Sequence, residues 1–310
     1  MDHGKCGKAR HGAIERNDEI AKENCEIKSI KNRYRRNRLS SPRIFDAEHY
    51  ARLNSSREEA VSTLLKGLVP LLSLRTAIDV GCGAGYFSKF LRSMGFEITA
   101  VDGREENVEE TKRRVPDARV ATINAEDPRL GQLGRFDLVF CFGLLYHLEN
   151  PFQTIRSLYQ MTGQVLLVEG VIFPGNDVLM GLVDEGRGED QGLNFVAFYP
   201  TEACLIKMMY RAGFTNVYKF SEMPRHPDFR PRGNTRRVRT MLAASSVDLR
   251  DELLERVPEP RMAVQPWIGA AEHKSILRSA YRFASKPLPE KIGIAKKLVG
   301  LPAKDPSKKS

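Results

Sequence analysis

The sequence predicts a doubly wound α/β fold, in which helices cover both faces of a mainly parallel sheet. Short apolar segments rich in β-branched residues alternate with segments of helical period along the middle of the chain. Such alternation is typical of right-handed strand–helix–strand units, which build parallel sheets. Glycines directly follow the first apolar segment, and an aspartate ends the second. Both features are typical of folds that bind a nucleotide-like ligand beyond the carboxyl ends of their strands.

Seven segments are predicted to be strands because each is short, apolar and rich in β-branched or aromatic residues. These are residues 76–80, 97–101, 118–123, 136–142, 164–171, 215–220 and 238–244. The helices predicted between them are residues 87–94, 104–115, 151–161 and 201–213. The expected sheet is therefore Rossmann-like and seven-stranded.

Charge is distributed unevenly along the chain. Residues 1–45 carry 12 basic and 6 acidic side chains, and residues 224–310 carry 19 and 9. Residues 46–223 carry 18 basic and 24 acidic side chains. The excess positive charge of the chain, +10 in total, therefore lies at its two ends.

The predicted domains follow this division. Residues 1–44 form a basic arm, helical or disordered, residues 45–245 form the central domain, and residues 246–310 form a basic extension whose end is disordered. Basic ends can hold the phosphates of an RNA, and a solubilising role fits them as well. The segment of residues 292–301 (IGIAKKLVGL) is predicted to contact a membrane surface weakly.

The composition predicts a cytoplasmic globular protein. With 41% hydrophobic residues the chain can form a large core. No apolar run approaches the ~18–20 residues of a spanning helix, and the first residues lack the apolar region of a secretory signal. The five cysteines are scattered without disulfide-framework or metal-ligand spacing. We therefore expect free thiols, a reducing compartment and no metal site.

The glycine-rich loop at residues 79–86 (DVGCGAGY) predicts a cofactor site. Glycine allows a ligand to approach the backbone closely, and Asp102 stands where a ribose-binding carboxylate is expected. Asp79 would repel a pyrophosphate, and Tyr86 occupies the position of the third glycine in the NAD motif. A ligand with an ammonium group therefore fits this loop better than NAD does.

Four motifs, in order, resemble those of the class I S-adenosylmethionine (SAM)-dependent methyltransferases. They are DVGCGAG, AVDG after the second strand, INAED after the third, and FDLVFCFGLLYHLENP around the fourth. The similarity covers residues 45–245. GLLYHLENP further resembles the subgroup that includes tRNA wobble-uridine carboxymethyl-type enzymes and many small-molecule or glycan methyltransferases. The resemblance implies that SAM is the cofactor.

The resemblance also assigns cofactor-binding residues. They are Arg57, Asp79, Gly81, Gly83, Gly85, Asp102, Asn124, Ala125, Glu126 and Phe142. Asp79 and the glycine loop would hold the methionine part, and Asp102 the ribose hydroxyls. Residues 124–126 would border the adenine, and Phe142 would lie beside the sulfonium. Arg57 would contact the carboxylate of SAM. The alternative role of Asp79 is a helix cap, and that of Asp102 is a turn residue. The alternative for Phe142 is core packing, and for Arg57 it is a surface ion pair.

His147 and Tyr146 are the predicted catalytic residues. His147 follows the fourth strand, near the expected methyl group, and histidine is suited to act as a base at neutral pH. The alternatives for His147 are a hydrogen bond to acceptor or cofactor and a structural cap. Tyr146 would orient the acceptor or contact the sulfonium through its ring. Residues 171–200 are expected to form a lid of apolar and acidic character, and the alternative is a plain surface excursion. The arginines of residues 224–239 would bind a phosphate or carboxylate of the acceptor, and the alternative is a solvated, arginine-rich loop.

The predicted function is methyl transfer from SAM to an oxygen or nitrogen of a small-molecule acceptor, with sugars and anionic metabolites as candidates. One alternative is an RNA-modifying methyltransferase that uses the basic flanks. A second is a non-catalytic SAM-binding protein. An NAD-dependent oxidoreductase is disfavoured by Tyr86. The sequence specifies neither the acceptor nor the oligomeric state.

Overall fold

The structure is a computed structural model that describes residues 44–188, 190–230 and 238–261. Contacts divide the chain into compact units of residues 1–260 and 261–310, and every element described here belongs to the first. Residues 1–43 of the predicted basic arm, and the segment 292–301 that is predicted to contact a membrane, lie outside the described residues. The division of the chain into arm, domain and extension therefore stays a prediction.

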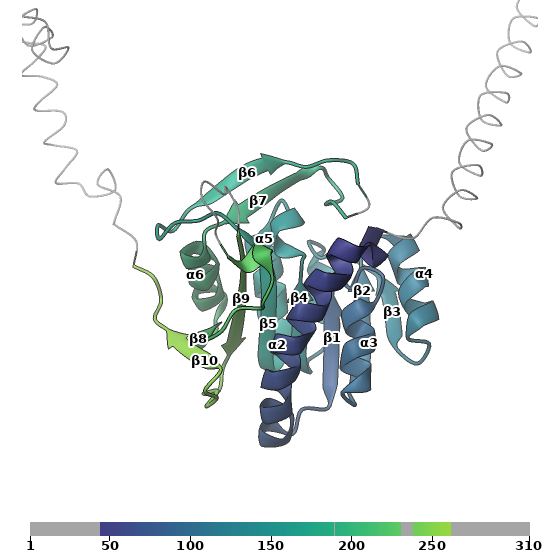
Figure 1. The fold of residues 1–310 in the computed structure, drawn as a ribbon, viewed down its shortest axis with the longest axis horizontal. Helices are drawn as coiled ribbons and strands as arrows, with labels where there is room; N and C mark the ends of the chain where they lie inside the picture. Colours follow the sequence, from purple (N-terminus) through teal and green to yellow (C-terminus); the bar gives the residue numbers. More distant parts are fainter. Residues whose placement is uncertain (1–43, 189, 231–237, 262–310) are drawn as a thin grey trace, which may run out of the picture. The chain divides into compact units, whose positions relative to one another are not determined.

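Eight strands form the central sheet, in the order β10-β8-β9-β5-β4-β1-β2-β3 (Figure 1). Their bounds are β1 (Thr76–Val80), β2 (Glu97–Asp102), β3 (Arg119–Thr122), β4 (Phe136–Phe142), β5 (Thr162–Ile172), β8 (Asn216–Phe220), β9 (Val238–Ser245) and β10 (Leu254–Val257). Strands β1 to β5 pair in parallel. Strand β9 is antiparallel to both β5 and β8, and β10 is antiparallel to β8. The predicted mainly parallel, doubly wound sheet is confirmed.

The sheet has one strand more than the sequence predicts. Strand β10 lies beyond residue 245, where we placed the end of the domain. Its sequence, LERV, alternates only weakly, and Glu255 and Arg256 at its centre are exposed. A four-residue edge strand of this kind carries little periodic signal.

Helices cover both faces of the sheet, as predicted. The α-helices are α2 (Glu48–Leu72), α3 (Tyr86–Ser93), α4 (Glu105–Arg114), α5 (Pro151–Met161) and α6 (Glu202–Ala212). Short 3-10 segments are η1 (Ile44–Asp46), η2 (Pro128–Gln132), η3 (Leu145–His147) and η4 (Pro227–Phe229). Helices α2 and α3 contribute to one buried cluster, and α5 and α6 to the cluster on the other face. Both clusters share the apolar strands, so the sheet is the centre of the core.

Helix α2 packs on one face of the sheet through a continuous apolar stripe. Val61, Leu64, Leu65 and Leu68 are fully buried and recur at helical spacing, so they form one apolar stripe against the sheet. The helix starts beside the carboxyl ends of the strands and runs to their opposite ends (Figure 1). Its first turns are thereby placed at the edge of the sheet where the loops of the predicted site lie. Among the described helices, none is both long and apolar enough to cross a bilayer.

The insertion between β5 and α6 forms a separate two-stranded sheet. Strands β6 (Met180–Asp184) and β7 (Val196–Pro200) pair antiparallel, beyond the carboxyl ends of the central strands (Figure 1). The sequence predicts a lid here without predicting strands. Leu179, Met180 and Leu182 remain exposed on this hairpin.

Candidate active site

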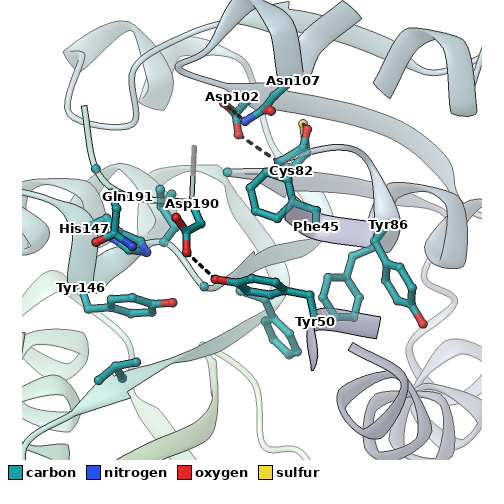
Figure 2. A pocket seen from close by; sticks show the side chains of 18 of the residues that line it. Phe45, Tyr50, Cys82, Tyr86, Asp102, Asn107, Tyr146, His147, Asp190 and Gln191 are labelled. Carbon is teal, nitrogen blue, oxygen red and sulfur yellow. Dashed lines mark hydrogen bonds between the residues drawn. The ribbon is translucent and has the colours of Figure 1, made fainter. Parts of the chain in front are cut away.

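One cavity of about 790 Å³ lies at the carboxyl ends of the parallel strands. The start of α2, the glycine-rich loop, the ends of β2 and β4, η3 and the β6–β7 hairpin all line it. Figure 2 shows Asp102, Cys82 and Phe45 on one side, with Tyr146, His147 and Asp190 on another. The cavity thus joins the predicted cofactor residues to the predicted catalytic residues.

The glycine loop has the backbone conformation that makes its glycines necessary. Gly81 and Gly83 have positive φ angles of 76° and 54°. A Cβ on Gly81 would lie 2.9 Å from the side chain of Leu144. A Cβ on Gly83 would lie 3.8 Å from the Phe45 ring, at ordinary van der Waals distance, and both residues line the cavity.

Asp102 is held in place by three N–H donors. Its Oδ2 accepts from the Gly83 N–H at 2.9 Å, and its Oδ1 accepts from the Arg104 N–H at 2.8 Å and the Asn107 side chain at 3.0 Å. Burial raises the pKa of Asp102 above its ordinary value, against the effect of these hydrogen bonds. The carboxylate keeps lone pairs for further donors at the cavity wall.

Asp79 occupies a different position from the one that the resemblance implies. It is buried, does not line the cavity and accepts a hydrogen bond from the Ser88 hydroxyl at 2.6 Å. Burial raises the pKa of its carboxyl to about 7. Asp79 therefore stabilises the glycine loop and the start of α3 without lining the cavity. This role resembles the helix cap that is the alternative for Asp79 in the sequence analysis. Gly85, whose φ is 79°, also lies outside the cavity lining.

The remaining predicted cofactor residues line the cavity. Asn124 accepts from the Glu126 N–H, and Glu126 accepts from the Asn150 N–H, so both side chains also stabilise their loop. Ala125 is buried between them. Phe142 stacks on Phe140 with 3.9 Å between ring centroids. Phe142 is thus a core residue that also borders the cavity.

Arg57 is buried, so a surface ion pair does not describe it. Its Nη2 lies 2.8 Å from Oε2 of Glu169, and its Nη1 donates to Asn54. Burial lowers the pKa of Arg57, and the Glu169 carboxylate opposes that shift. Its Nε has no hydrogen-bond partner among the described residues. Arg57 lines the cavity, but its Nε is itself buried.

A second arginine shares the same carboxylate. Arg239 donates to Glu169 at 2.9 Å and to the Tyr146 hydroxyl at 3.3 Å. It also lies 3.4 Å from Asp228. Arg239 belongs to β9 rather than to a solvated loop, because it faces Val171 of β5 in the sheet. The buried network therefore fixes the Tyr146 ring at the wall of the cavity.

His147 lies in η3, directly after β4, and lines the cavity beside Tyr146 (Figure 2). Its Nδ1 is 2.5 Å from Oε1 of Glu185, at the end of β6. Tyr50 of α2 donates to Asp190 at 2.6 Å, and Arg104 donates to the Gln191 carbonyl at 2.8 Å. The hairpin thus contacts both the catalytic end and the cofactor end of the cavity.

The sequence analysis placed Glu185 and Asp190 in the expected lid, but the predicted site residues include neither of them nor Glu169. Glu169 had a detectable signal, since it is the only charged residue in the apolar run VLLVEGVI. A lone acid in a central strand must find a buried partner. Glu185 and Asp190 had no such signal because their partners are 38 and 140 residues away. No group of three or more His, Cys, Asp or Glu side chains in the described part of the chain is arranged to hold a metal ion.

Comparison with known proteins identifies the family. A model described as "Methyltransferase domain" matches residues 52–219, which is more than half of the chain. The chain therefore belongs to this methyltransferase domain family. The resemblance inferred from the four motifs is confirmed.

Curated relatives match the chain over about half of their own length. The tRNA U34 carboxymethyltransferase of Actinobacillus succinogenes is 31% identical over 163 residues, which is 50% of this chain and 49% of the relative. The protein of the same name from Pseudoalteromonas atlantica is 32% identical over 156 residues, 47% of this chain and 46% of the relative. Among solved structures, the N-terminal domain of EvdMO1 with S-adenosylhomocysteine (SAH) bound has a TM-score of 0.51 and 19% identity. That match covers 62% of this chain and 80% of the other. This likeness shows the shared fold.

Proposed function

We propose that this protein transfers a methyl group from SAM to an oxygen, or a nitrogen, of a small polar acceptor. The observation that carries the proposal is a single cavity with two chemically different ends. One end holds the glycine loop and the Asp102 carboxylate, and the other holds His147 and Tyr146. A methyltransferase needs both ends, since donor and acceptor must meet in line.

The cofactor end fits SAM on its own geometry. Asp102 would accept from the ribose hydroxyls, and residues 124–126 would border the adenine. Gly81 and Gly83 line the cavity, and their backbone would lie against the methionine part. Arg57, which lines the same cavity, would contact its carboxylate. Asp79 would act indirectly, through the loop that it supports.

The residues of this chain would contribute position, desolvation and proton transfer. When bound, SAM supplies a methyl group on a positively charged sulfur. Tyr146, fixed by Arg239, would orient the acceptor, and the β6–β7 hairpin would exclude water from the catalytic end. His147 would take the proton from an acceptor hydroxyl as the acceptor oxygen gives its electron pair to the methyl carbon. The predicted roles of His147 and Tyr146 thus remain proposals that the geometry supports.

The acceptor end favours a small molecule with hydroxyl groups. Tyr50, Asp190 and Tyr146 present polar atoms there, and Arg239 adds positive charge. The hairpin contacts α2 through Tyr50 and Asp190, which encloses this end of the cavity. An enclosed polar pocket suits an acceptor such as a sugar or an anionic metabolite.

RNA is the second candidate acceptor, and the names of the relatives favour it. Each relative described above is named as a tRNA-modifying enzyme. A nucleotide would have to leave its stack to reach an enclosed site. Binding of tRNA that weakens about tenfold or more between 50 and 200 mM salt would support this candidate. Absence of tRNA binding at low salt would leave the small-molecule acceptor.

Calorimetric titration with SAH tests the cofactor assignment, with NAD as a parallel ligand. We expect SAH to bind and NAD not to bind. Asp102→Ala should weaken SAH binding about 10- to 100-fold, because it removes charge-assisted hydrogen bonds of about 1.5–3 kcal/mol. Asp117→Ala, which removes an exposed carboxylate paired with Arg92, is the matched control and should leave SAH affinity unchanged. Binding of NAD in place of SAH would contradict the proposal, and binding of SAH without turnover on any acceptor would indicate a non-catalytic SAM-binding protein.

A further inference from the structure

Glu185 is a buried carboxylate with two partners from different parts of the site. Its Oε1 lies 2.5 Å from Nδ1 of His147, and its Oε2 accepts the Gly192 N–H at 2.7 Å. Only 2% of its side chain is exposed. A buried carboxylate is stable when hydrogen-bond donors satisfy it, and here one of those donors is the ring of the proposed base.

The arrangement distinguishes the two ring nitrogens of His147. An ionised carboxylate only accepts hydrogen bonds, so the nitrogen that faces Glu185 must carry the proton. That nitrogen is Nδ1. For Nε2 the structure shows no hydrogen-bond partner among the described residues, and the ring lines the cavity. The unprotonated nitrogen of a neutral ring would therefore be the one available to an acceptor.

The rest of the histidine is also fixed. The His147 N–H donates to the Leu144 carbonyl at 2.8 Å within η3, and the Tyr146 ring lies 4.2 Å from the imidazole, centroid to centroid. The ring is thus held by its own backbone, by an aromatic neighbour and by Glu185. Of these three, Glu185 alone discriminates between the two tautomers.

We propose that Glu185 is a positioning residue for catalysis, which holds His147 protonated at Nδ1 so that Nε2 can take the acceptor proton. The inference rests on the proposed function of His147. After proton transfer both ring nitrogens carry hydrogen, and the Glu185 carboxylate stabilises the resulting positive charge. Because Glu185 belongs to the hairpin, the segment that encloses the acceptor also sets the protonation pattern of the base.

A purely structural role is the competing explanation. In that case Glu185 would only fasten the hairpin, through Gly192 and the imidazole, without affecting which nitrogen is protonated. The two explanations differ in the tautomer of His147 and in its response to substitution. Both can be measured on the full chain without an acceptor.

The test is nitrogen NMR of the full-length protein labelled at its six histidines. Loss of one ring signal in His147→Gln assigns His147. We expect the neutral ring of wild-type His147 to be almost entirely protonated at Nδ1. In Glu185→Gln this tautomer should lose its dominance. Glu185→Asp keeps the carboxylate and should partly restore the wild-type tautomer.

Asp184→Asn is the matched control, since it removes an exposed neighbouring carboxylate of the same hairpin and should leave the tautomer of His147 unchanged. Protonation at Nε2 in the wild type would overturn the proposal, and so would an unchanged tautomer in a folded Glu185→Gln variant. If Glu185→Gln does not fold, Nε2 protonation of the wild-type ring still overturns the proposal, and Glu185→Asp supplies the comparison between variants. Failure of SAH to bind would instead contradict the proposed function, so the two failures are distinguishable.

Discussion

Arg57 and Glu169 form a buried ion pair that connects helix α2 to strand β5, with 2.8 Å between Nη2 and Oε2. Both side chains are almost completely removed from solvent. Arg239 binds the other oxygen of the same carboxylate. One buried acid thus balances two cations beside the cavity, and the start of α2 is fixed relative to the sheet.

Removal of that acid should be strongly destabilising. Glu169→Ala leaves two buried guanidinium groups without their shared partner, and loss of one member of a buried pair costs about 3–5 kcal/mol. Urea denaturation should show a lower midpoint with a similar slope. Glu109→Ala, at an exposed ion pair with Lys112, is the control and should change stability by less than about 1 kcal/mol. A small effect of Glu169→Ala would mean that water or rearrangement compensates the arginines.

Asp79 should make stability depend on pH in the opposite direction from an ordinary paired carboxylate. Its pKa is about 7 in the folded protein, because burial disfavours the charged form, and 3.8 is its reference value. The folded state therefore binds more protons than the unfolded state between about pH 4 and pH 7. The contribution of Asp79 to the free energy of unfolding is therefore greatest at and below pH 4, and it falls as the pH rises from 4 towards 7.

Asp79→Asn isolates this contribution. The variant keeps a hydrogen-bond acceptor for Ser88 and loses the buried charge. It should be more stable than wild type at pH 8, with a difference that shrinks as pH falls towards 4. Each unit of pKa difference corresponds to about 1.4 kcal/mol. Urea denaturation of both proteins at several pH values measures the difference, and a constant difference at all pH values would contradict the assignment.

Gly170 should be required for the position of the Tyr146 ring. A Cβ at residue 170 would lie 3.1 Å from Cδ1 of Tyr146, which is closer than ordinary van der Waals contact. Gly170→Ala should therefore displace the ring and cost about 1–3 kcal/mol through overpacking. Gly186→Ala in the hairpin is the control, because a Cβ there meets nothing within 4 Å. Equal unfolding temperatures for the two variants would show that the ring moves freely.

The hydroxyl of Tyr50 should hold the hairpin against α2. Tyr50→Phe removes its hydrogen bond to the Asp190 carboxylate and leaves the aromatic ring. Hydrogen exchange should become faster in residues 190–195 and in the first turn of α2, while the central strands keep their protection. Tyr210→Phe, which removes a hydrogen bond to the Val257 carbonyl away from the cavity, should leave exchange in residues 190–195 unchanged. Unaltered exchange in Tyr50→Phe would indicate that other contacts hold the hairpin.

The fold was predictable because its signals are local. Apolar strands, helical periodicity and the loop at residues 79–86 all appear within short windows of sequence. Strand β4, for example, has the predicted bounds, residues 136–142. Strands β6 and β7 were not predicted, because their pairing depends on the surrounding site more than on their own composition.

The candidate site was predictable to the extent that motifs carry it. Asp102 lies at the cavity as expected, whereas Asp79 lies behind it, since a motif does not specify which way a side chain points. The Arg57–Glu169 pair could not be predicted because it depends on how α2 crosses the sheet. Long-range contacts of this kind, including His147 with Glu185, determine which side chains meet at the cavity.

The β6–β7 hairpin pairs only with itself among the described strands that form ladders, while the central sheet holds the cofactor loops in fixed register. Substitutions, insertions or deletions in the hairpin would leave that register unaltered. Under the proposed function, sequence change in the hairpin would alter the surroundings of His147 through Glu185 and those of Tyr50 through Asp190, while the ladders that carry Asp102 and the glycine loop keep their pairing.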